Sequence, residues 1–378
     1  MPLAPQQASR PASANTQNVG MVVPFARASR WHIEQGDSRA GLVISGTPAP
    51  VVLTIPSYGY LAGVFLTVAA TGGVGIAATY YEDAPWSAIQ QIQLSDVNGV
   101  PIVQLDGYSA FLAAKFGGYK LFGPDPAAYL GGYQPGTADG NFRFTLPIWL
   151  SFGRDGLGCL PNMDASASYR LTVQLATAAA GATGPLYTAA NPGLPTVALT
   201  VHGIYRSQPP AADSFGNRNA TVPPAIGTVG YWSRQTWAGL TGAQTIQLSR
   251  VGNLIRNQFL IFRDTADGTR ATAETSDLPP SIEYDWDSGV RYVSTLDIQR
   301  LREFMARGTI HPAGVVFYGN TDDPDGIAGA EYGDSWMPTS GASKLTLRFT
   351  PAASCGLTVI TNDVVPSSQQ VYSAANGG

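Results

Sequence analysis

The side chains that could carry out acid–base, nucleophilic or metal chemistry are few and lie far apart in the sequence. His32, His202 and His311 belong to different segments, and none has a second histidine or a cysteine within four positions. Metal sites and nucleophilic centres need several such groups held close together. The chain also lacks the G-x-S-x-G, H-E-x-x-H and P-loop motifs. We therefore expect no catalytic residue, no metal ion and no cofactor, and hence no enzyme.

One group of carboxylates has a spacing that suits hydrolytic chemistry. Glu283, Asp285 and Asp287 alternate along a segment that predicts a strand, and alternate residues of a strand share a face. Paired carboxylates can act as acid and base in the hydrolysis of glycosidic bonds. We expect instead a solvated strand face, with Trp286 pointing to the opposite, inner side.

A second acidic group, the TDDPDG segment at 321–326, resembles part of a calcium-binding loop. The EF-hand spacing fails, because the twelfth position counted from Thr321 is Tyr332 and the acidic Glu331 is one place off. We expect an exposed acidic loop, and a weak calcium site between subunits is the alternative.

The aromatic residues and cysteines suit burial better than chemistry. Two aromatic groups could bind sugar, but packing in cores and interfaces is the commoner role, and we expect that role here. Cys159 and Cys355 are far apart and outside any C-x-x-C motif, so we expect two buried, unpaired thiols. The two aromatic groups are Tyr80, Tyr81 and Trp86, and Tyr231, Trp232 and Trp237.

The composition narrows the class of protein. The 378 residues include 43 Gly and 28 Pro, which disfavours an all-helical protein or a coiled coil. The net charge of −4 disfavours a basic nucleic-acid binder, and we expect no direct nucleic-acid binding. Only 13% of residues are charged, which favours a subunit that buries much of its surface against neighbours. A secreted β-protein is the alternative.

From Pro50 onward, short β-branched or alternating runs bounded by turn residues predict strands. The uncharged stretch 61–79 predicts two strands joined by a loop at Gly72 and Gly73, not a membrane span. Asn98-Gly99 predicts a hairpin turn. The predicted strands are 51–55, 61–70, 89–96, 100–105, 142–150, 169–176 and 197–205, followed by 245–251, 256–264, 281–287, 290–294, 314–319, 344–350 and 356–361.

Each half also contains one segment with helical spacing. The first spans 106–118, where Asp106 can cap the start and Gly117 can end the helix. The second spans 294–308, with Ser294 or Thr295 as the cap and Gly308 after the last turn. The apolar residues of the second helix share one face, and they are Ile298, Leu301, Phe304 and Met305.

The same order of strands, one helix, and further strands occurs twice, which predicts two tandem domains. We expect the second half to be an independent copy of the first half's two-layer sandwich. Residues 1–30 predict an extended, mildly basic arm, in which Arg10, Arg27 and Arg30 are candidate inward-facing contacts. The expected divisions are the arm at 1–30, a first sandwich at 31–205, a linker at 206–228, a second sandwich at 229–366 and a tail at 367–378.

Two segments resemble a known family. At 146–176, an apolar strand containing Leu-Pro leads through a loop with Leu157, Leu160 and Asn162 into a second strand. At 295–319, a helix leads into a strand. The residues and the order of elements in these two segments resemble those of the tectivirus-type double jelly-roll major capsid proteins of tailless bacteriophages with an internal membrane. The prolines of the arm depart from the family, because they disfavour a long helix there.

The resemblance implies an all-β protein of two tandem eight-stranded jelly-roll sandwiches, each with one inserted helix. It implies a major capsid protein that self-assembles into pseudo-hexagonal homotrimeric capsomers of an icosahedral, membrane-containing phage. The expected partners are other copies of the chain, the internal lipid membrane, and minor capsid or penton proteins. The expected location is the capsid shell of the virion, after synthesis in the host cytoplasm. The alternatives are a tandem jelly-roll carbohydrate-active enzyme and a carbohydrate-binding or spike module.

Overall fold

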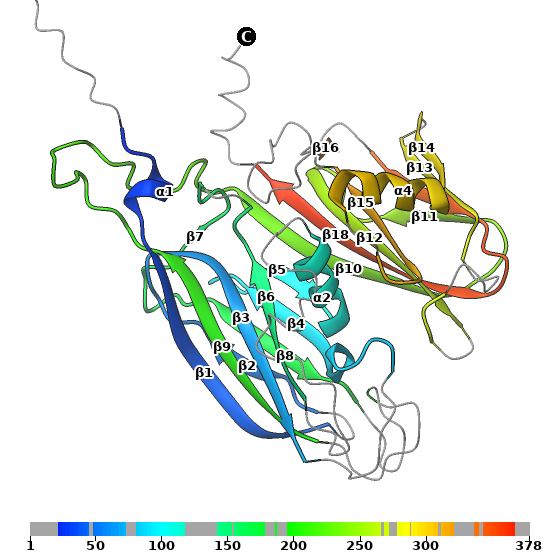
Figure 1. Cartoon of the computed structure of the whole chain (residues 1–378), viewed down its shortest axis with the longest axis horizontal. Coiled ribbons are helices and arrows are strands. Elements are labelled where there is room, and N and C mark those ends of the chain that lie inside the picture. Colours follow the sequence, from blue (N-terminus) through cyan, green and yellow to red (C-terminus); the bar gives the residue numbers. More distant parts are fainter. Residues whose placement is uncertain are drawn as a thin grey trace, which may run out of the picture.

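The computed structural model describes the chain as a β-protein with two sandwiches (Figure 1). Its described residues are 22–44, 48–72, 81–117, 142–152, 155–177, 186, 195–265, 268–271, 278–287, 289–308, 311–320, 336–339 and 343–366.

The first half contains a short helix α1, a long hairpin-rich strand set, and one longer helix α2. Its elements are α1 (Phe25–Ala28), β1 (Trp31–Val43), β2 (Val51–Thr54), β3 (Tyr60–Thr71), the 3-10 helix η1 (Trp86–Ala88), β4 (Ile89–Ser95), β5 (Pro101–Leu105), α2 (Gly107–Phe116), β6 (Phe142–Trp149), β7 (Leu160–Pro161), β8 (Arg170–Leu175) and β9 (Thr196–Arg206).

The second half repeats this order with one helix, α4. Its elements are β10 (Val229–Leu240), β11 (Gln244–Leu248), β12 (Leu254–Asp264), β13 (Ser281–Trp286), β14 (Gly289–Thr295), α4 (Leu296–Arg307), β15 (Val315–Gly319), β16 (Met337–Pro338), β17 (Leu345–Phe349) and β18 (Cys355–Val365).

Both halves pair their strands in the same order. In the first, β1-β9-β3-β6 faces β2-β8-β4-β5, and in the second, β10-β18-β12-β15 faces β11-β17-β13-β14. Helix α2 connects β5 to β6, and α4 connects β14 to β15. The short strands β7 and β16 are added to β3 and β12. Two packed antiparallel sheets with these crossing connections make each half a jelly roll, here called roll 1 and roll 2. The prediction of tandem jelly rolls is confirmed, and among the described residues each roll has one helix between its fifth and sixth strands.

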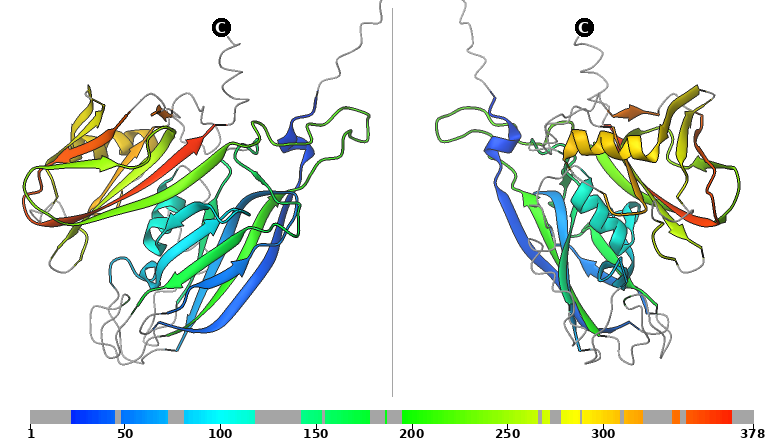
Figure 2. Two further views of the ribbon diagram at one scale, coloured as in Figure 1. Left: turned by 180° about the vertical axis from the view of Figure 1, so that it is seen from behind. Right: turned by 45° about the vertical axis from the view of Figure 1, so that its right-hand side comes forward.

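The two rolls also contact each other through their backbones. Strand β5 of roll 1 lies parallel to β10 of roll 2, with Val103 opposite Trp232. This contact joins one sheet from each roll into a single nine-stranded sheet. The sheets β1-β9-β3-β6 and β11-β17-β13-β14 remain separate, so each roll still consists of two layers (Figure 2).

The sequence does not predict two long strands, β1 and β10, because β1 and the second half of β10 are mostly exposed or only half-buried. Of the 13 residues of β1, none is fully buried, and charged residues interrupt its apolar ones. The distal half of β10 alternates between half-buried and exposed side chains. Strand prediction from alternation depends on one face being buried, and that condition fails here. Both strands hold their places through backbone pairing with β9 and β18.

Two large apolar clusters account for the core. One fills roll 1 and continues across the junction into roll 2, where it includes Phe259, Phe317 and Ile360. The other lies between the two sheets of roll 2 and includes Phe262, Leu347 and Val359. Alternate residues of β12, β15 and β18 therefore belong to different clusters, so this sheet is buried on both faces.

The helix boundaries follow the predicted caps. The Asp106 side chain accepts a hydrogen bond from the Ser109 backbone N–H at the start of α2. The Thr295 side chain does the same for Ile298 at the start of α4, and Gly308 ends α4 in the left-handed conformation. In the described part of the chain, no helix is long and apolar enough to cross a membrane. Strand β3 covers the start of the uncharged stretch up to Thr71, and the predicted second strand lies outside the described residues.

Candidate functional site

The candidate site is the junction between the rolls, where side chains and the C-terminal end of α2 contact residues of roll 2. All residues of α2 except Lys115 are buried. The α2 residues Phe111 and Phe116 belong to the same apolar cluster as Trp232, Phe259 and Phe317 of roll 2. A helix that is apolar all round suits this position, because it is covered on both sides.

The C-terminal end of α2 binds buried polar groups of roll 2. The carbonyl of Gly117 accepts hydrogen bonds from Arg256 Nη1 (2.8 Å) and Asn257 Nδ2 (3.0 Å). Carbonyls at a helix C-terminus lack partners within the helix and carry partial negative charge, so a buried guanidinium is a fitting partner. The ring of Phe116 lies 4.7 Å from that of His311. These contacts lock the helix end to the second roll.

The N-terminal end of α2 is tied to roll 2 by an ion pair. Asp106 caps the helix through Oδ1, and its Oδ2 pairs with Arg234 of β10. One carboxylate therefore serves both the helix start and the contact between rolls. Both ends of α2 are thus held by charged groups of the other half.

A cluster of four charged side chains closes the junction beside η1. Asp83 pairs with Arg263 and with Arg270, whose Nε lies 2.9 Å from Asp83 Oδ1. Glu82 pairs with Arg270 at 3.3 Å. Both guanidinium groups lie over the ring of Tyr108, and burial raises the pKa of the Tyr108 hydroxyl. A pocket of about 200 Å³ borders this cluster.

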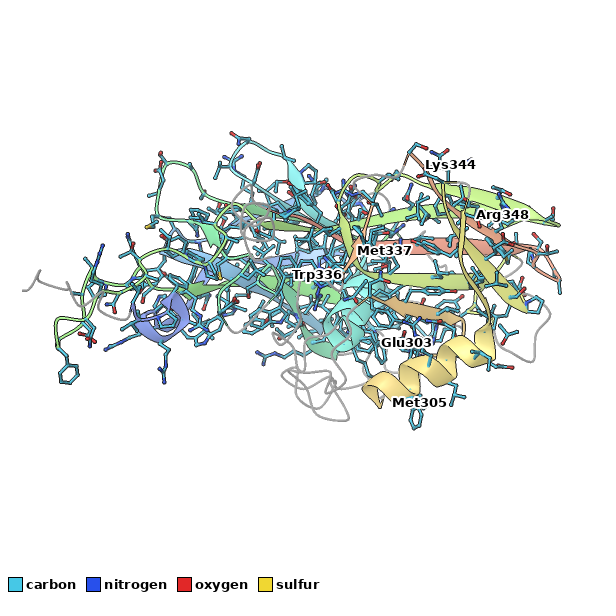
Figure 3. All side chains as sticks on the ribbon, turned by 90° about the horizontal axis from the view of Figure 1, so that it is seen from above. Glu303, Met305, Trp336, Met337, Lys344 and Arg348 are labelled. Carbon is cyan, nitrogen blue, oxygen red and sulfur yellow. The ribbon has the colours of Figure 1, made fainter. Side chains whose placement is uncertain are left out.

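Helix α4 occupies the position in roll 2 that α2 occupies in roll 1, but it is covered on one side only. Its polar residues Gln299 and Glu303 face the sheet and are 2% and 3% exposed. Gln299 donates a hydrogen bond to the carbonyl of Phe317 (2.8 Å). The opposite face, the α4 surface, is apolar and exposed, with Met305 78% exposed and pointing away from the molecule (Figure 3). The α4 surface consists of Ile298, Leu301, Phe304 and Met305.

A second uncovered apolar area lies on the outer face of roll 1. Ile33 of β1 pairs with Ile204, which pairs with Gly63, which pairs with Trp149, so Ile33 and Trp149 share one row and one face. Trp149 contacts Trp31 and Phe65 edge-on, with ring centroids 6.4 and 6.1 Å apart. Trp31 and Ile33 are 51% and 56% exposed. The outer β1 surface is defined as Trp31, Ile33, Phe65 and Trp149.

The predicted carboxylate face is wrong in two respects. Asp285 is 2% exposed, and its carboxylate pairs with Arg348 at 3.0 Å, so the face is not solvated there. Arg348 also pairs with Glu283 at 3.4 Å, since the two residues are opposite each other on β13 and β17. Asp287 leaves the strand and accepts hydrogen bonds from the Ser343 and Lys344 backbone N–H groups. The side chain of Trp286 lies outside the described set.

The single guanidinium explains how the two carboxylates coexist. Arg348 lies between Glu283 and Asp285 and offsets their mutual repulsion. The arrangement therefore supports pairing between β13 and β17.

The other predicted residues are dispersed. His32, His202 and His311 lie on β1, on β9 and before β15, and no cluster of metal-ligating side chains occurs among the described residues. Cys159 and Cys355 are buried and form no disulfide, as predicted. Trp86 stacks on Phe111, and Trp232 packs against Phe259, which confirms burial for these aromatics. The described members of the two aromatic groups are Tyr81, Trp86, Tyr231, Trp232 and Trp237; Tyr80, Arg10 and the 321–326 loop lie outside the described residues.

The described part of the arm lies at the end of the molecule where β18 also ends (Figure 1). Arg27 on α1 and Arg30 before β1 are exposed. The segment between β9 and β10 folds back onto this region, where the Val23 N–H donates to the carbonyl of Arg218. Its tip carries Phe215, which is 89% exposed.

Comparisons with known proteins give similarity in structure only. No protein family matches the sequence, and no curated protein matches it. The capsid of the virus PBCV-1 is similar over 89% of this chain and 94% of that chain, with 14% identity and a TM-score of 0.60. A chain of Sulfolobus turreted icosahedral virus is similar over 89% and 91%, with 10% identity and a TM-score of 0.60.

A bacteriophage protein shows the same likeness. The major capsid protein P2 of bacteriophage PM2 is similar over 90% of this chain and 98% of that chain, with 10% identity and a TM-score of 0.51. Because the likeness extends over both rolls and nearly the whole length of the other chains, the fold is the double jelly roll of these viral capsid proteins.

Proposed function

We propose that the protein is a major capsid protein that self-assembles into homotrimeric, pseudo-hexagonal capsomers of an icosahedral virus. The observation that carries this proposal is the match of both rolls, over 89% of the chain, to proteins that form viral capsids. Three chains of two rolls each give six similar rolls around one axis, which suits a tile with nearly sixfold outline.

The surface supports assembly. Apolar side chains are exposed on α4 and on β1, whereas scattered single exposure is the norm for a monomer. The ordered junction between the rolls fixes their relative orientation through α2, its two polar ends and the charged cluster. A rigid two-roll unit presents the same contacts in every copy, which a closed shell requires.

The alternative of a carbohydrate-active enzyme has less support. The rival predicts converging carboxylates in a cleft where the rolls meet. Asp83 and Glu82 do lie there beside the pocket, but both are paired with arginines. We infer a structural role for these carboxylates, and the protein's work is assembly, not catalysis.

The measurement that tests the function is the mass of the native particle. Sedimentation equilibrium should give about 119 kDa, three times the 39.7 kDa of the chain. Electron microscopy of the same sample should show six lobes around a threefold axis. A monomer at all concentrations would contradict the proposal.

The arm has a separate role in this proposal. Arg10, Arg27 and Arg30 would face the interior and contact lipid phosphates of an internal membrane or neighbouring capsomers, and minor capsid proteins would complete the shell. Deletion of residues 1–30 should then leave trimers intact and prevent shell closure. Complete shells from the deleted chain would exclude this role of the arm without affecting the trimer.

A further inference from the structure

The two rolls give the chain two versions of the same pair of surfaces. The first member is the helix between the fifth and sixth long strands of a roll, α2 or α4. The second member is the outer face of the sheet that starts with the roll's first strand, β1-β9-β3-β6 or β10-β18-β12-β15. Within the chain, helix α2 of roll 1 meets the outer sheet face of roll 2. Helix α4 of roll 2 and the outer sheet face of roll 1 remain uncovered.

The covered pair shows what this contact requires. Helix α2 lies on the outer face of the roll 2 sheet, where Phe259 is flanked in one row by Ile360 and Phe317. These three side chains are buried, although they point away from the core of roll 2. The outer face of this sheet is therefore built to receive a helix.

The uncovered pair has matching chemistry. The α4 surface is a row of apolar side chains on a helix whose inner side is polar, which is the reverse of a surface helix in a monomer. The outer β1 surface supplies exposed Trp31 and Ile33 beside the half-buried Phe65 and Trp149. The defining members of both surfaces are uncharged. Two arginines lie beside them: Arg302 is exposed on α4 one turn after Ile298, and the guanidinium of Arg206 lies over the ring of Trp31 at 3.8 Å.

The edge strands of the two rolls agree with this arrangement. Within the chain, edge strand β5 of roll 1 meets first strand β10 of roll 2. The corresponding strands at the free ends are β14, which is the edge of its sheet, and β1, which is also an edge. Val293 of β14 is exposed beside α4. Exposed edges of this kind are normally covered or paired in native proteins.

We propose that the α4 surface of one copy docks on the outer β1 surface of the next copy, in the way that α2 docks on the roll 2 sheet within the chain. The occupant of the α4 surface is thus a second copy of this chain. The contact is head-to-tail, because the two surfaces differ, and repetition of it closes a ring when the rotation allows. This inference rests on the proposed self-assembly and names the residues that carry it.

Two double variants remove one surface each. In the α4 variant, Leu301→Glu and Met305→Glu place charges on the helix, and in the sheet variant, Trp31→Glu and Ile33→Glu place them on β1. Each variant alone should sediment as a 39.7 kDa monomer, because every contact of the ring needs both surfaces. A matched control, Phe215→Glu with Val97→Glu, changes exposed apolar residues elsewhere and should stay trimeric.

Mixing the two variants gives the decisive result. The α4 variant keeps an intact β1 surface and the sheet variant keeps an intact α4 surface, so the mixture should form one contact and stop. We expect a dimer of about 79 kDa, twice the mass of the chain, and no larger species. Circular dichroism confirms that both variants keep their β-structure; if either unfolds, Met305→Ser and Ile33→Ser replace them in the same mixing experiment.

The outcomes separate this inference from the proposed function. If the wild-type chain is not a trimer, the proposed function itself fails. If the wild type is a trimer and the α4 or sheet variant remains one, the docking inference is wrong and the function stands. Variants that become monomers but form no dimer when mixed would also overturn the inference, since the two surfaces would then contact something other than each other, such as a membrane or a different protein.

Discussion

Asp83 is the residue on which the charged cluster at the junction depends. Its carboxylate forms ion pairs with Arg263, in β12 of roll 2, and with Arg270, which follows β12. Asp83 itself belongs to the turn before η1 in roll 1. Glu82 pairs with Arg270. Two partly buried guanidinium groups over one tyrosine ring would repel each other without these carboxylates. The cluster therefore links segments almost two hundred positions apart in the sequence.

Replacement of Asp83 by alanine should lower the free energy of unfolding by about 3 kcal/mol, because it leaves partly buried arginines without their partner. Chemical denaturation monitored by tryptophan fluorescence measures this change. Glu34→Gln, at an exposed position on β1, is the control and should have a much smaller effect. An equal effect of the two substitutions would show that the cluster contributes nothing specific.

At the scale of elements, helix α2 is held where it starts by close contact with η1. A Cβ atom added at Gly107 would lie 2.1 Å from the carbonyl oxygen of Trp86. The ring of Trp86 stacks on Phe111 of the same helix, with centroids 3.7 Å apart. The helix therefore depends on a glycine at a position where alanine would favour helix formation.

Gly107→Ala should destabilise the protein by about 2 kcal/mol, because the overlap with Trp86 outweighs the gain in helix propensity of about 1 kcal/mol. Thermal unfolding followed by circular dichroism tests the sign of the effect. A variant more stable than the wild type would mean that α2 can shift away from η1 without loss of packing.

The two helices also show that the place of a helix in the fold determines which of its faces is apolar. Helix α2 is apolar all round and covered on both sides, whereas α4 directs Gln299 and Glu303 inward and its apolar residues outward. The helical spacing of apolar residues identifies the apolar face of α4, but it does not show which face of the helix packs on the sheet. The direction follows from the sheet beneath, where the carbonyl of Phe317 needs a donor and Gln299 supplies it.

At the scale of the whole molecule, the shared nine-stranded sheet and the shared apolar cluster make the two rolls one unit. We expect a single cooperative unfolding transition in scanning calorimetry, because opening roll 2 would expose α2 and the core of roll 1 with it. Two resolved transitions, one for each roll, would contradict this coupling.

The whole molecule should also lose stability in alkaline solution. Burial raises the pKa of the Cys159 thiol to about 12 and that of the Tyr169 hydroxyl to about 12. In the unfolded chain, these groups ionise near 8.5 and 10. Between these values and 12 the native state holds more protons than the unfolded state, so the free energy of unfolding falls as pH rises.

The midpoint temperature should therefore be steady from pH 7 to 8 and fall above about pH 9. Tyr169→Phe removes one of the responsible groups and should make the fall above pH 10 shallower. The same midpoint at pH 7 and pH 11 would show that these groups titrate alike in both states.

The sequence determined the class of the fold and most of its elements through local physics. Side-chain alternation gave strands such as β3 and β8, and the caps Asp106 and Thr295 placed both helices to within two residues. The repeat of strand and helix order predicted two rolls. Each of these features depends on neighbours within a few positions, so it is encoded where it occurs.

The contacts between these elements depend on the tertiary structure and do not follow from the sequence pattern. The strands β1 and β10 form through pairing with β9 and β18, far away in the sequence, and their own alternation is too weak to predict them. The fusion of the rolls, the burial of Asp285 beside Arg348 and the outward apolar side of α4 depend on contacts across many tens of residues. Whether a side chain is buried depends on which elements pack against it. The sequence pattern shows which side chains are apolar or polar, but it does not show which of them become buried.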